Sequence, residues 1–288
     1  MDTIALVDQY PGEDERVTAH EITRAGGGPA AVAAVALSRL GIETAVVGTI
    51  GDDADGHELL RIFSQENVDT SGISIGSTAT AGSVIVASKE HSARAISTRQ
   101  PVVQAAINKA AQKLIAQAQW VHVDHVGVTR LEEMGLSRGK GAQISFDAGY
   151  GVENFDPILV DLFVPTDRQM ALRYPGIDLA VALENDSLKA GNTVVATQGS
   201  AGSAGFSPET GLITAQGFTV DVVSTLGAGD VFHGALVAQL IQGHSLQIAM
   251  RRANAVAALS CRGLDGQSMI PTTTELDAYL EAHSRENH

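Results

Sequence analysis

Hydrophobic and polar residues follow a regular order of helical and β-prone segments along the second half of the chain. The expected strands lie at residues 120–123, 143–146, 162–164 and 193–196. The expected helices lie at residues 102–118, at 129–138 and near Asn154, with further helical residues before the last strand. Strands that alternate with helices predict a doubly wound, mostly parallel sheet flanked by helices, which is an α/β fold.

The first hundred residues contain more β-prone runs and fewer helices. Helices are expected at residues 30–40, which are rich in Ala and Val and end before Gly41, and at residues 53–65, which are amphipathic. Strands are expected at residues 3–7, 17–22, 44–48, 83–87 and 94–97, the last two as a hairpin. We interpret residues 1–288 as a single domain, with a small β lid formed by about 3–22 and 83–97.

The last third of the chain ends in helices. Short β-prone runs are expected at residues 205–206, 212–214 and 218–222. Helices are expected at residues 228–242, 246–261 and 273–283. The sequence has no internal repeat, low-complexity tract or recognisable linker, which agrees with a single domain.

The composition argues against several classes of protein. A formal charge of −14 disfavours binding to duplex nucleic acid, which depends on Lys and Arg at phosphates, although a small anionic substrate needs only a few local donors. The single cysteine, Cys261, rules out an intramolecular disulfide and a cysteine-based zinc cluster. No apolar run reaches the ~18 residues of a membrane span and no signal peptide opens the chain, so we expect no membrane association and a cytoplasmic location.

The most informative segment is Asp221-Val-Val-Ser-Thr-Leu-Gly-Ala-Gly-Asp230, where a strand is expected to end and an apolar helix to begin. The free N–H groups and the dipole at a helix start form an anion site, and Gly227 and Gly229 allow a phosphate to approach the backbone. A carboxylate at Asp230 is a poor phosphate ligand but a suitable base for an attacking hydroxyl in phosphoryl transfer. The alternative is that Asp230 only caps a glycine-packed helix.

This segment, followed by its apolar helix, closely resembles the C-terminal signature of the PfkB carbohydrate kinases, which have a ribokinase-like fold. The resemblance implies that Asp230 is the catalytic base and that Gly227, Ala228 and Gly229 form the anion hole. It also implies ATP and Mg²⁺ as cofactors and a small sugar as the substrate. Thr225, within the same signature, is expected on the nucleotide side.

The segment Gly27 to Gly41 is similar to the family's N-terminal signature, in which a glycine pair opens a helix of small residues. The resemblance implies that Gly26, Gly27 and Gly28 lie against the sugar. A glycine N-cap on a buried helix remains the alternative. A dinucleotide-binding loop is a weaker option, because the third glycine of Gly-x-Gly-x-x-Gly is missing.

Further residues are assigned to the nucleotide by the same resemblance. Thr197, Gly199 and Gly202 belong to a loop similar to the family's nucleotide-side loop, and Asn254 belongs to a helix that borders the adenine pocket in relatives. For Asn254 the alternative is an ordinary amide on a helix surface. The segment Gly48 to Gly56 resembles the turn that follows the family's next strand, and we interpret Asp52 and Asp53 within it as a helix cap rather than as metal ligands.

Three features depart from the family pattern. Asp2 occupies the position of the sugar-binding aspartate, but the core strand that precedes it in the family is missing, which we interpret as a truncated start or a misplaced initiator Met. Val32 replaces an asparagine that contacts sugar. Thr166-Asp-Arg-Gln169 replaces the Asn-x-x-Glu sequence that helps to organise magnesium, so no metal ligand is assigned and metal handling is expected to be altered.

The substrate is the least defined element. Several details resemble the sulfofructose kinase branch, so sulfofructose is the first candidate, ahead of other ketoses and ribose. Arg16 and Arg99 are candidates for contact with the substrate, with a solvated surface arginine as the alternative for Arg16. His122, His125 and His233 are expected near the site without an essential role. A non-catalytic sugar or nucleotide sensor stays open, and relatives imply a homodimer through the lid.

Overall fold

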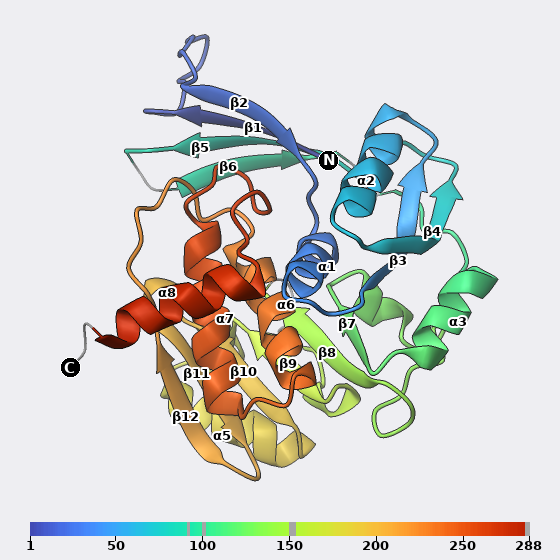
Figure 1. The fold of residues 1–288 in the computed structure, drawn as a ribbon, viewed down its shortest axis with the longest axis vertical. Helices are drawn as coiled ribbons and strands as arrows, with labels where there is room; N and C mark the ends of the chain where they lie inside the picture. The colour runs from blue at the N-terminus through green and yellow to red at the C-terminus, as the bar shows by residue number, and fades with distance from the viewer. Residues whose placement is uncertain (91–92, 100–101, 150–153, 286–288) are drawn as a thin grey trace.

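The computed structural model describes residues 1–90, 93–99, 102–149 and 154–285, and its main feature is a six-stranded sheet with helices on both faces (Figure 1). The strand order is β12-β11-β10-β9-β8-β7. The strands are β7 (Trp120–Val123), β8 (Gln143–Ala148), β9 (Leu162–Pro165), β10 (Thr193–Thr197), β11 (Gly202–Ser207) and β12 (Gly211–Gln216). β7 to β10 are parallel, and β11 and β12 are antiparallel additions at the edge. The expected α/β fold with a mostly parallel sheet is confirmed.

Helices bury both faces of this sheet. The helices are α1 (Pro29–Arg39), α2 (Ala54–Gln65), α3 (Lys109–Gln117), α4 (Asp167–Arg173), α5 (Leu179–Ala190), α6 (Ala228–Ile241), α7 (Leu246–Ser260) and α8 (Thr273–Arg285). Along β9, Leu162 and Val164 join the core of α1, α6 and α7, whereas Phe163 joins the opposite core with residues of α4 and α5. Successive side chains of a strand point to opposite faces, so the apolar run of β9 is explained by burial on both sides.

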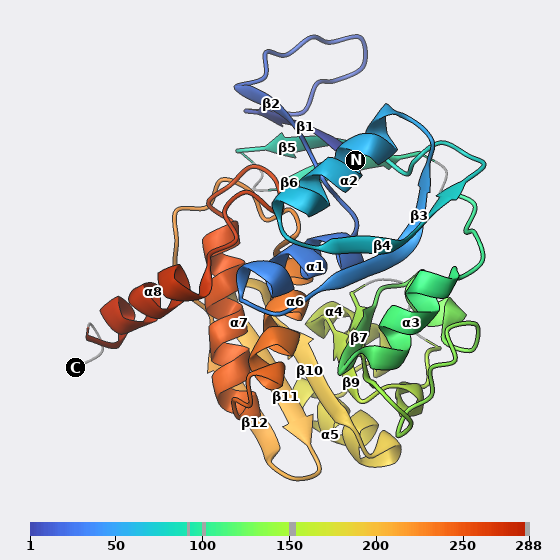
Figure 2. The ribbon, with the colours of Figure 1, turned by 45° about the vertical axis from the view of Figure 1, so that its right-hand side comes forward.

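A separate four-stranded sheet lies at one end of the molecule, above α6 and α7 in Figures 1 and 2. Its order is β2-β1-β5-β6, with β1 (Asp2–Val7), β2 (Glu21–Ala25), β5 (Ser83–Ser88) and β6 (Ala93–Thr98). One face packs on Leu226 and Leu264 of two loops that precede and follow α6 and α7. We call it the small sheet. A third, two-stranded parallel sheet consists of β3 (Ala45–Gly51) and β4 (Asp69–Gly76).

Several expected elements are wrong in extent. The helix expected at 102–118 begins only at Lys109, because Asn108 caps it and the N–H groups of Val103 and Ala105 bond to threonine hydroxyls of the β3–β4 region. The helix expected at 129–138 is only a 3₁₀ turn at Gly127–Arg130, and Gly135 follows with a φ of 68°. The strand expected at 17–22 lies at Glu21–Ala25, 218–222 form no strand, and β4 was not expected.

The helix cap expected at Asp53 is confirmed. Its carboxylate accepts hydrogen bonds from Gly56 N at 2.8 Å and from Thr80 N and Oγ1 at 2.8 and 2.6 Å. The hydrogen bonds from Thr80 and then Gly56 lower the pKa of Asp53 to about 2. The carboxylate is therefore committed to the start of α2 and to the loop before the small sheet.

Among the described residues, no helix combines the length and the apolar character that crossing a membrane requires.

Candidate active site

The turn before α6 has no side-chain cap, and its shape depends on the backbone conformation of Gly227. Gly227 is the N-cap with a φ of 74°, a left-handed conformation that disfavours other residues. A Cβ at Gly227 would lie 2.8 Å from the Cα of Gly266, so two loops meet here with no room for a side chain. The segment before the turn is not the expected strand, since Val223 N and Ser224 N both bond to the carbonyl of Cys261, at the end of α7.

The start of α6 is open to solvent. Its first helical hydrogen bond runs from Val231 N to Gly227 O at 2.9 Å, so the N–H groups of Gly229 and Asp230 precede that bond and point out of the helix end. Gly229 is exposed, and a Cβ there would meet no atom within 4 Å. The helix start therefore has amide donors and a positive dipole end that face solvent, although the N–H of Ala228, which the resemblance assigned to the anion hole, bonds to Thr225 O at 3.3 Å.

Asp230 lies in the first turn of α6 and is partly buried. Burial and the nearby carboxylate of Asp147 raise the pKa of Asp230 to about 7, against the opposing effects of His233 and Arg94. A carboxylate with a pKa near neutrality is suited to accept a proton from a hydroxyl, whereas a simple capping aspartate has a low pKa.

Two residues near Asp230, Asp147 and Arg94, were missed in the sequence, and a third, His233, was undervalued. Asp147, at the end of β8, lies 3.1 Å from Nδ1 of His233, a residue that was expected to face the site without being essential. The position of Asp147 at the carboxyl end of a parallel strand was the available signal, because such ends line ligand sites in open α/β sheets.

Arg94 is the second missed residue. It lies on β6 of the small sheet, and its Nη1 donates to Thr225 Oγ1 at 3.1 Å. Arg94 therefore connects the small sheet to the turn before α6, and its charge lowers the pKa of Asp230. No local pattern distinguished Arg94 from other exposed arginines, because the contact joins residues 131 positions apart.

The expected sugar-side residues Asp2, Gly26 and Gly27 are brought together. A Cβ at Gly27 would lie 2.0 Å from Oδ2 of Asp2, and a Cβ at Gly26 would lie 3.0 Å from Nε2 of Gln267. Burial raises the pKa of Asp2, against the lowering effects of the N-terminal amine and of Ser83. Gly28 caps α1 with a φ of 98°. The glycines are therefore needed for the close approach of Asp2 and for the start of α1.

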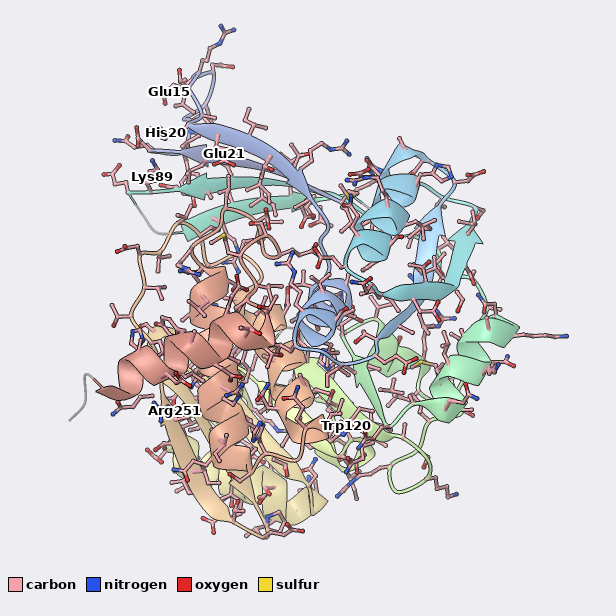
Figure 3. All side chains as sticks on the ribbon, in the orientation of Figure 1. Glu15, His20, Glu21, Lys89, Trp120 and Arg251 are labelled. Carbon is pink, nitrogen blue, oxygen red and sulfur yellow. The ribbon has the colours of Figure 1, made fainter. Side chains whose placement is uncertain are left out.

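The two expected arginines differ in their surroundings. Arg99 Nη1 donates to Thr80 O at 2.9 Å, and Arg99 also lies 3.8 Å from the carboxylate of Asp55, at the Asp2 end of the small sheet. Arg16 is exposed in the β1–β2 connection. Its neighbour Glu15 lies at the outer tip of that connection, away from the six-stranded sheet (Figure 3). Arg16 is therefore not among the groups that the fold brings to Asp230.

The loop around Gly266 is held by a distant arginine. Arg39, at the end of α1, donates from Nη1 to Gln267 O at 2.9 Å and to Ile270 O at 2.8 Å. It also forms two hydrogen bonds to the carboxylate of Glu66, at 2.7 and 2.6 Å. The helix that begins at the sugar-side glycines thus ends by fixing the loop that contacts Gly227.

Comparison with known proteins gives the family of this chain. The sequence model of the pfkB family carbohydrate kinases matches residues 1–273. The chain belongs to the pfkB family of carbohydrate kinases.

Curated relatives of this kinase cover nearly its whole length. The ribokinase of Haemophilus influenzae is 27% identical over 97% of this chain and 95% of its own length. The ATP-dependent ribose-1-phosphate kinase of Halopiger xanaduensis is 27% identical over 97% and 94%. The mouse ketohexokinase is 27% identical over 92% and 95%.

Solved structures show the same ribokinase-like fold. A candidate ribokinase from Agrobacterium tumefaciens has a TM-score of 0.88 at 24% identity and covers 99% of this chain and 95% of its own. A candidate ribokinase II from E. coli in complex with ATP and Mg²⁺ has a TM-score of 0.81 at 18% identity, with 98% and 96% covered. The Arabidopsis thaliana ribokinase complexed with ribose and ATP has a TM-score of 0.78 at 20% identity, with 97% and 95% covered.

The residues that were expected on the nucleotide side lie at the end of β10, at the start of β11 and beside the end of β12. Thr197 ends β10 and forms a bridge with Thr166, and Gly199 follows with a φ of 56°. Gly202 has a φ of 104°, and a Cβ there would lie 2.2 Å from Ala215 O. Gly202 therefore has a structural reason to be glycine.

Asn254 is not an amide on a helix surface, so that alternative was wrong. It is 7% exposed, and its Nδ2 lies 3.0 Å from Ala215 O, 3.1 Å from Ser203 Oγ and 3.2 Å from Gln216 O. The amide joins α7 to β11 and to the end of β12, beside the loop that was expected to face the nucleotide.

Magnesium fits the site through water rather than through a cage of carboxylates. Within the ranges that the structure describes, no group of three His, Cys, Asp or Glu side chains could hold a metal ion. At Gln169, where the family has Glu, Oε1 is buried without a hydrogen-bond partner. A buried free acceptor fits the water shell of Mg²⁺, which keeps several waters and binds substrate phosphates.

Proposed function

We propose that this kinase transfers the γ-phosphoryl group of ATP to a primary hydroxyl of a small sugar, with Asp230 as the base. The observation that carries the proposal is the carboxylate of Asp230, with its pKa near 7, beside unpaired amide donors at the open start of α6. A base and an anion cradle in one helical turn are the two parts that phosphoryl transfer requires of a protein.

In the proposed reaction, the chain mainly positions groups and handles one proton. When bound, ATP would supply the phosphoryl group and Mg²⁺ would neutralise much of its negative charge. The amides of Gly227, Ala228 and Gly229 would hold the oxygens of the moving phosphoryl group. Asp230 would accept the proton of the attacking hydroxyl, and Asp2 would bind other hydroxyls of the sugar from the small sheet.

The remaining nucleotide-side assignments are proposed for the same reaction. Thr197 and Gly199 would face the ATP phosphates, and Thr225 would do so from the turn before α6. Gly202 and Asn254 would act by fixing the backbone around the nucleotide, since both are engaged with the end of β12.

For the acceptor, we propose a ketose and keep sulfofructose as the first candidate. The match to a ketohexokinase supports a ketose, and the match to a ribose-1-phosphate kinase supports an acceptor that already carries an anionic group. Arg94 and Arg99 are the cations of the small sheet that would contact such a group, and Arg16 is less suited because of its place. Fructose and ribose are the next candidates.

The small sheet is proposed to be a lid on a single kinase domain and the site of a homodimer. Its register places Ile22 and Val84 on the face that points away from the body, and they are 68% and 58% exposed. Apolar residues on an outer sheet face support an interface between copies. The use of ATP supports a cytoplasmic location.

The test is ADP release measured with ATP, Mg²⁺ and a panel of sugars, including a sulfonated and an unsulfonated ketose. ADP release that depends on one sugar, and that is lost in Asp230→Asn with ATP affinity retained, is the expected result. Sugar or nucleotide binding without turnover across the panel would instead favour the sensor, for which the replaced residues Val32 and Gln169 are the specific reasons.

A further inference from the structure

A cluster of buried titratable residues lies directly beneath Asp230 and has no part in the proposed reaction. His233 follows Asp230 by three positions on α6, so both side chains lie on the same side of the helix. Asp147 comes from the end of β8 and His122 from β7. Asp147 and His233 are 8% and 3% exposed.

The surroundings of His233 fix its protonation. Its Nε2 lies 3.1 Å from the carbonyl oxygen of Val164, and its Nδ1 lies 3.1 Å from Oδ2 of Asp147. The carbonyl oxygen can only accept from Nε2, and the contact between Nδ1 and Asp147 is an ion pair that is not aligned as a hydrogen bond. Burial alone would lower the pKa of His233, but the charges of Asp147 and Asp230 raise it. The raised pKa and the adjacent carboxylate both favour the imidazolium form of His233.

The partner carboxylate is ionised. Burial alone would raise the pKa of Asp147, but His233 lowers it to about 2, helped by His122 and by Gly149 N, which donates to Oδ1 at 2.9 Å. Asp147 and His233 thus form a buried pair of opposite charges with Asp230 at its side. If either charge were removed, Asp230 would lie beside one uncompensated buried charge.

The other groups around Asp230 do not replace this pair. His122 is neutral, because burial and the charge of His233 lower its pKa to about 4, and its Nδ1 lies 2.8 Å from Ser145 Oγ. Asp124, after β7, accepts from the N–H groups of Val126 and Gly127 at 2.9 Å each. Arg94, on β6, reaches the region from the small sheet but is exposed.

We propose that His233 is a positioning residue that acts through Asp230: its positive charge balances Asp147, so that the base lies beside a neutral pair rather than beside a second carboxylate. This rests on the proposed function of Asp230. Two like charges in one partly buried site cannot both ionise freely, and without His233 the carboxylate of Asp230 would hold its proton at neutral pH and could not accept another.

The test is the pH profile of kcat/KM for the kinase with its best sugar. In wild type, activity should fall as the pH decreases through about 7, where Asp230 is protonated. In His233→Asn this acid limb should move up by about 1 pH unit or more, because Asp147 is left uncompensated. In the double variant Asp147→Asn with His233→Asn, both charges are gone, and the limb should return to within about 0.5 unit of wild type. His122→Asn removes a neutral ring and is the matched control, with the limb unmoved.

A purely structural role of His233 would lower stability in every variant. It would not shift the acid limb of the kcat/KM profile in His233→Asn and return it in the double variant. A limb that stays in place in His233→Asn, or that moves further in the double variant, overturns the proposal. If the variants fold poorly, nitrogen NMR of the wild-type His233 ring decides: protons on both nitrogens at pH 7.5 support the pair, and a neutral ring overturns it. Full turnover in Asp230→Asn would remove the proposed function as well, so the two failures are distinguishable.

Discussion

Two helices of this kinase begin with an aspartate after a glycine-containing turn, and they treat that aspartate in opposite ways. At α2, Asp53 is the N-cap and accepts from Gly56 and Thr80, which lowers its pKa to about 2. At α6, a glycine is the N-cap, no side chain bonds to the helix end, and the pKa of Asp230 is raised to about 7. At the start of α2 the carboxylate is already hydrogen-bonded within the protein. At the start of α6 the amide donors and the carboxylate remain free to bind a ligand.

This comparison shows why the sequence pattern alone was ambiguous. A helix cap satisfies the first N–H groups and uses up the carboxylate in doing so. A helix start that binds an anion must leave those groups unpaired, which lowers its own stability. The position of the aspartate, before the helix at α2 and in its first turn at α6, decides between the two outcomes.

The substitution Asp230→Asn is expected to have the largest effect on activity. Turnover should fall by about 10²- to 10⁴-fold, since an amide cannot accept the proton. Because the folded pKa of Asp230 lies above its unfolded value, its ionisation costs stability as the pH rises through about 7. The variant should therefore melt at a higher temperature than wild type at pH 8, with a smaller difference at pH 5. Thermal unfolding at both pH values, beside the ADP assay, checks this, and equal melting at pH 8 would contradict it.

Gly227→Ala tests whether the open helix start depends on its backbone. The substitution places a Cβ 2.8 Å from Gly266 in a left-handed conformation, at a cost of about 1–3 kcal/mol. We expect a higher KM for ATP and a lower kcat. Gly243→Ala is the matched control, since Gly243 also has a positive φ, of 81°, but no neighbour within 4 Å of its Cβ. Equal kinetic effects in the two variants would show that only general strain is measured.

Asp53→Ala tests the saturated helix start. Loss of the cap should lower the free energy of unfolding by about 0.5–2 kcal/mol, with kcat/KM changed by no more than about 3-fold. The pKa of Asp53 is lowered on folding, so its contribution is present above pH 4 and is lost as the pH falls toward 2. Urea titrations at pH 7 and pH 2.5 should show the difference from wild type shrinking at the lower pH. If the difference in unfolding free energy were the same at both pH values, the negative charge of Asp53 would not be the source of the stabilisation.

Arg94→Ala gives the smallest expected effect. Loss of its hydrogen bond to Thr225 should lower kcat/KM by about 2- to 10-fold and leave the melting temperature almost unchanged, because the side chain is exposed. Arg16→Ala, on the outer connection, is the control and should leave kcat/KM unaltered. A larger loss in Arg16→Ala than in Arg94→Ala would reverse the assignment of the two arginines.

The sequence predicted the parallel sheet and the glycine-bearing start of α6, because these depend on local periodicity and turn chemistry. It did not predict that residues 102–108 are not helical, since the N–H groups of Val103 and Ala105 are bound by Thr78, after β4, and by Thr49 of β3. It also missed Asp147 and undervalued His233, which acquire their properties only when β8 and α6 are packed together. The charged state of a buried group depends on its neighbours in space, and a single sequence does not list them.

The hydrogen bonds from Arg39 to the loop around Gly266 have a consequence for the evolution of this enzyme. The Arg39 guanidinium, at the end of α1, donates hydrogen bonds to the carbonyl oxygens of Gln267 and Ile270. The backbone of the neighbouring Gly266 packs directly against the backbone of Gly227. Because that junction has no side chains to absorb a shift, the backbone position at the start of α6 depends on an arginine of another helix. We therefore expect adaptation to a new sugar to spare Arg39 while freely altering the small sheet.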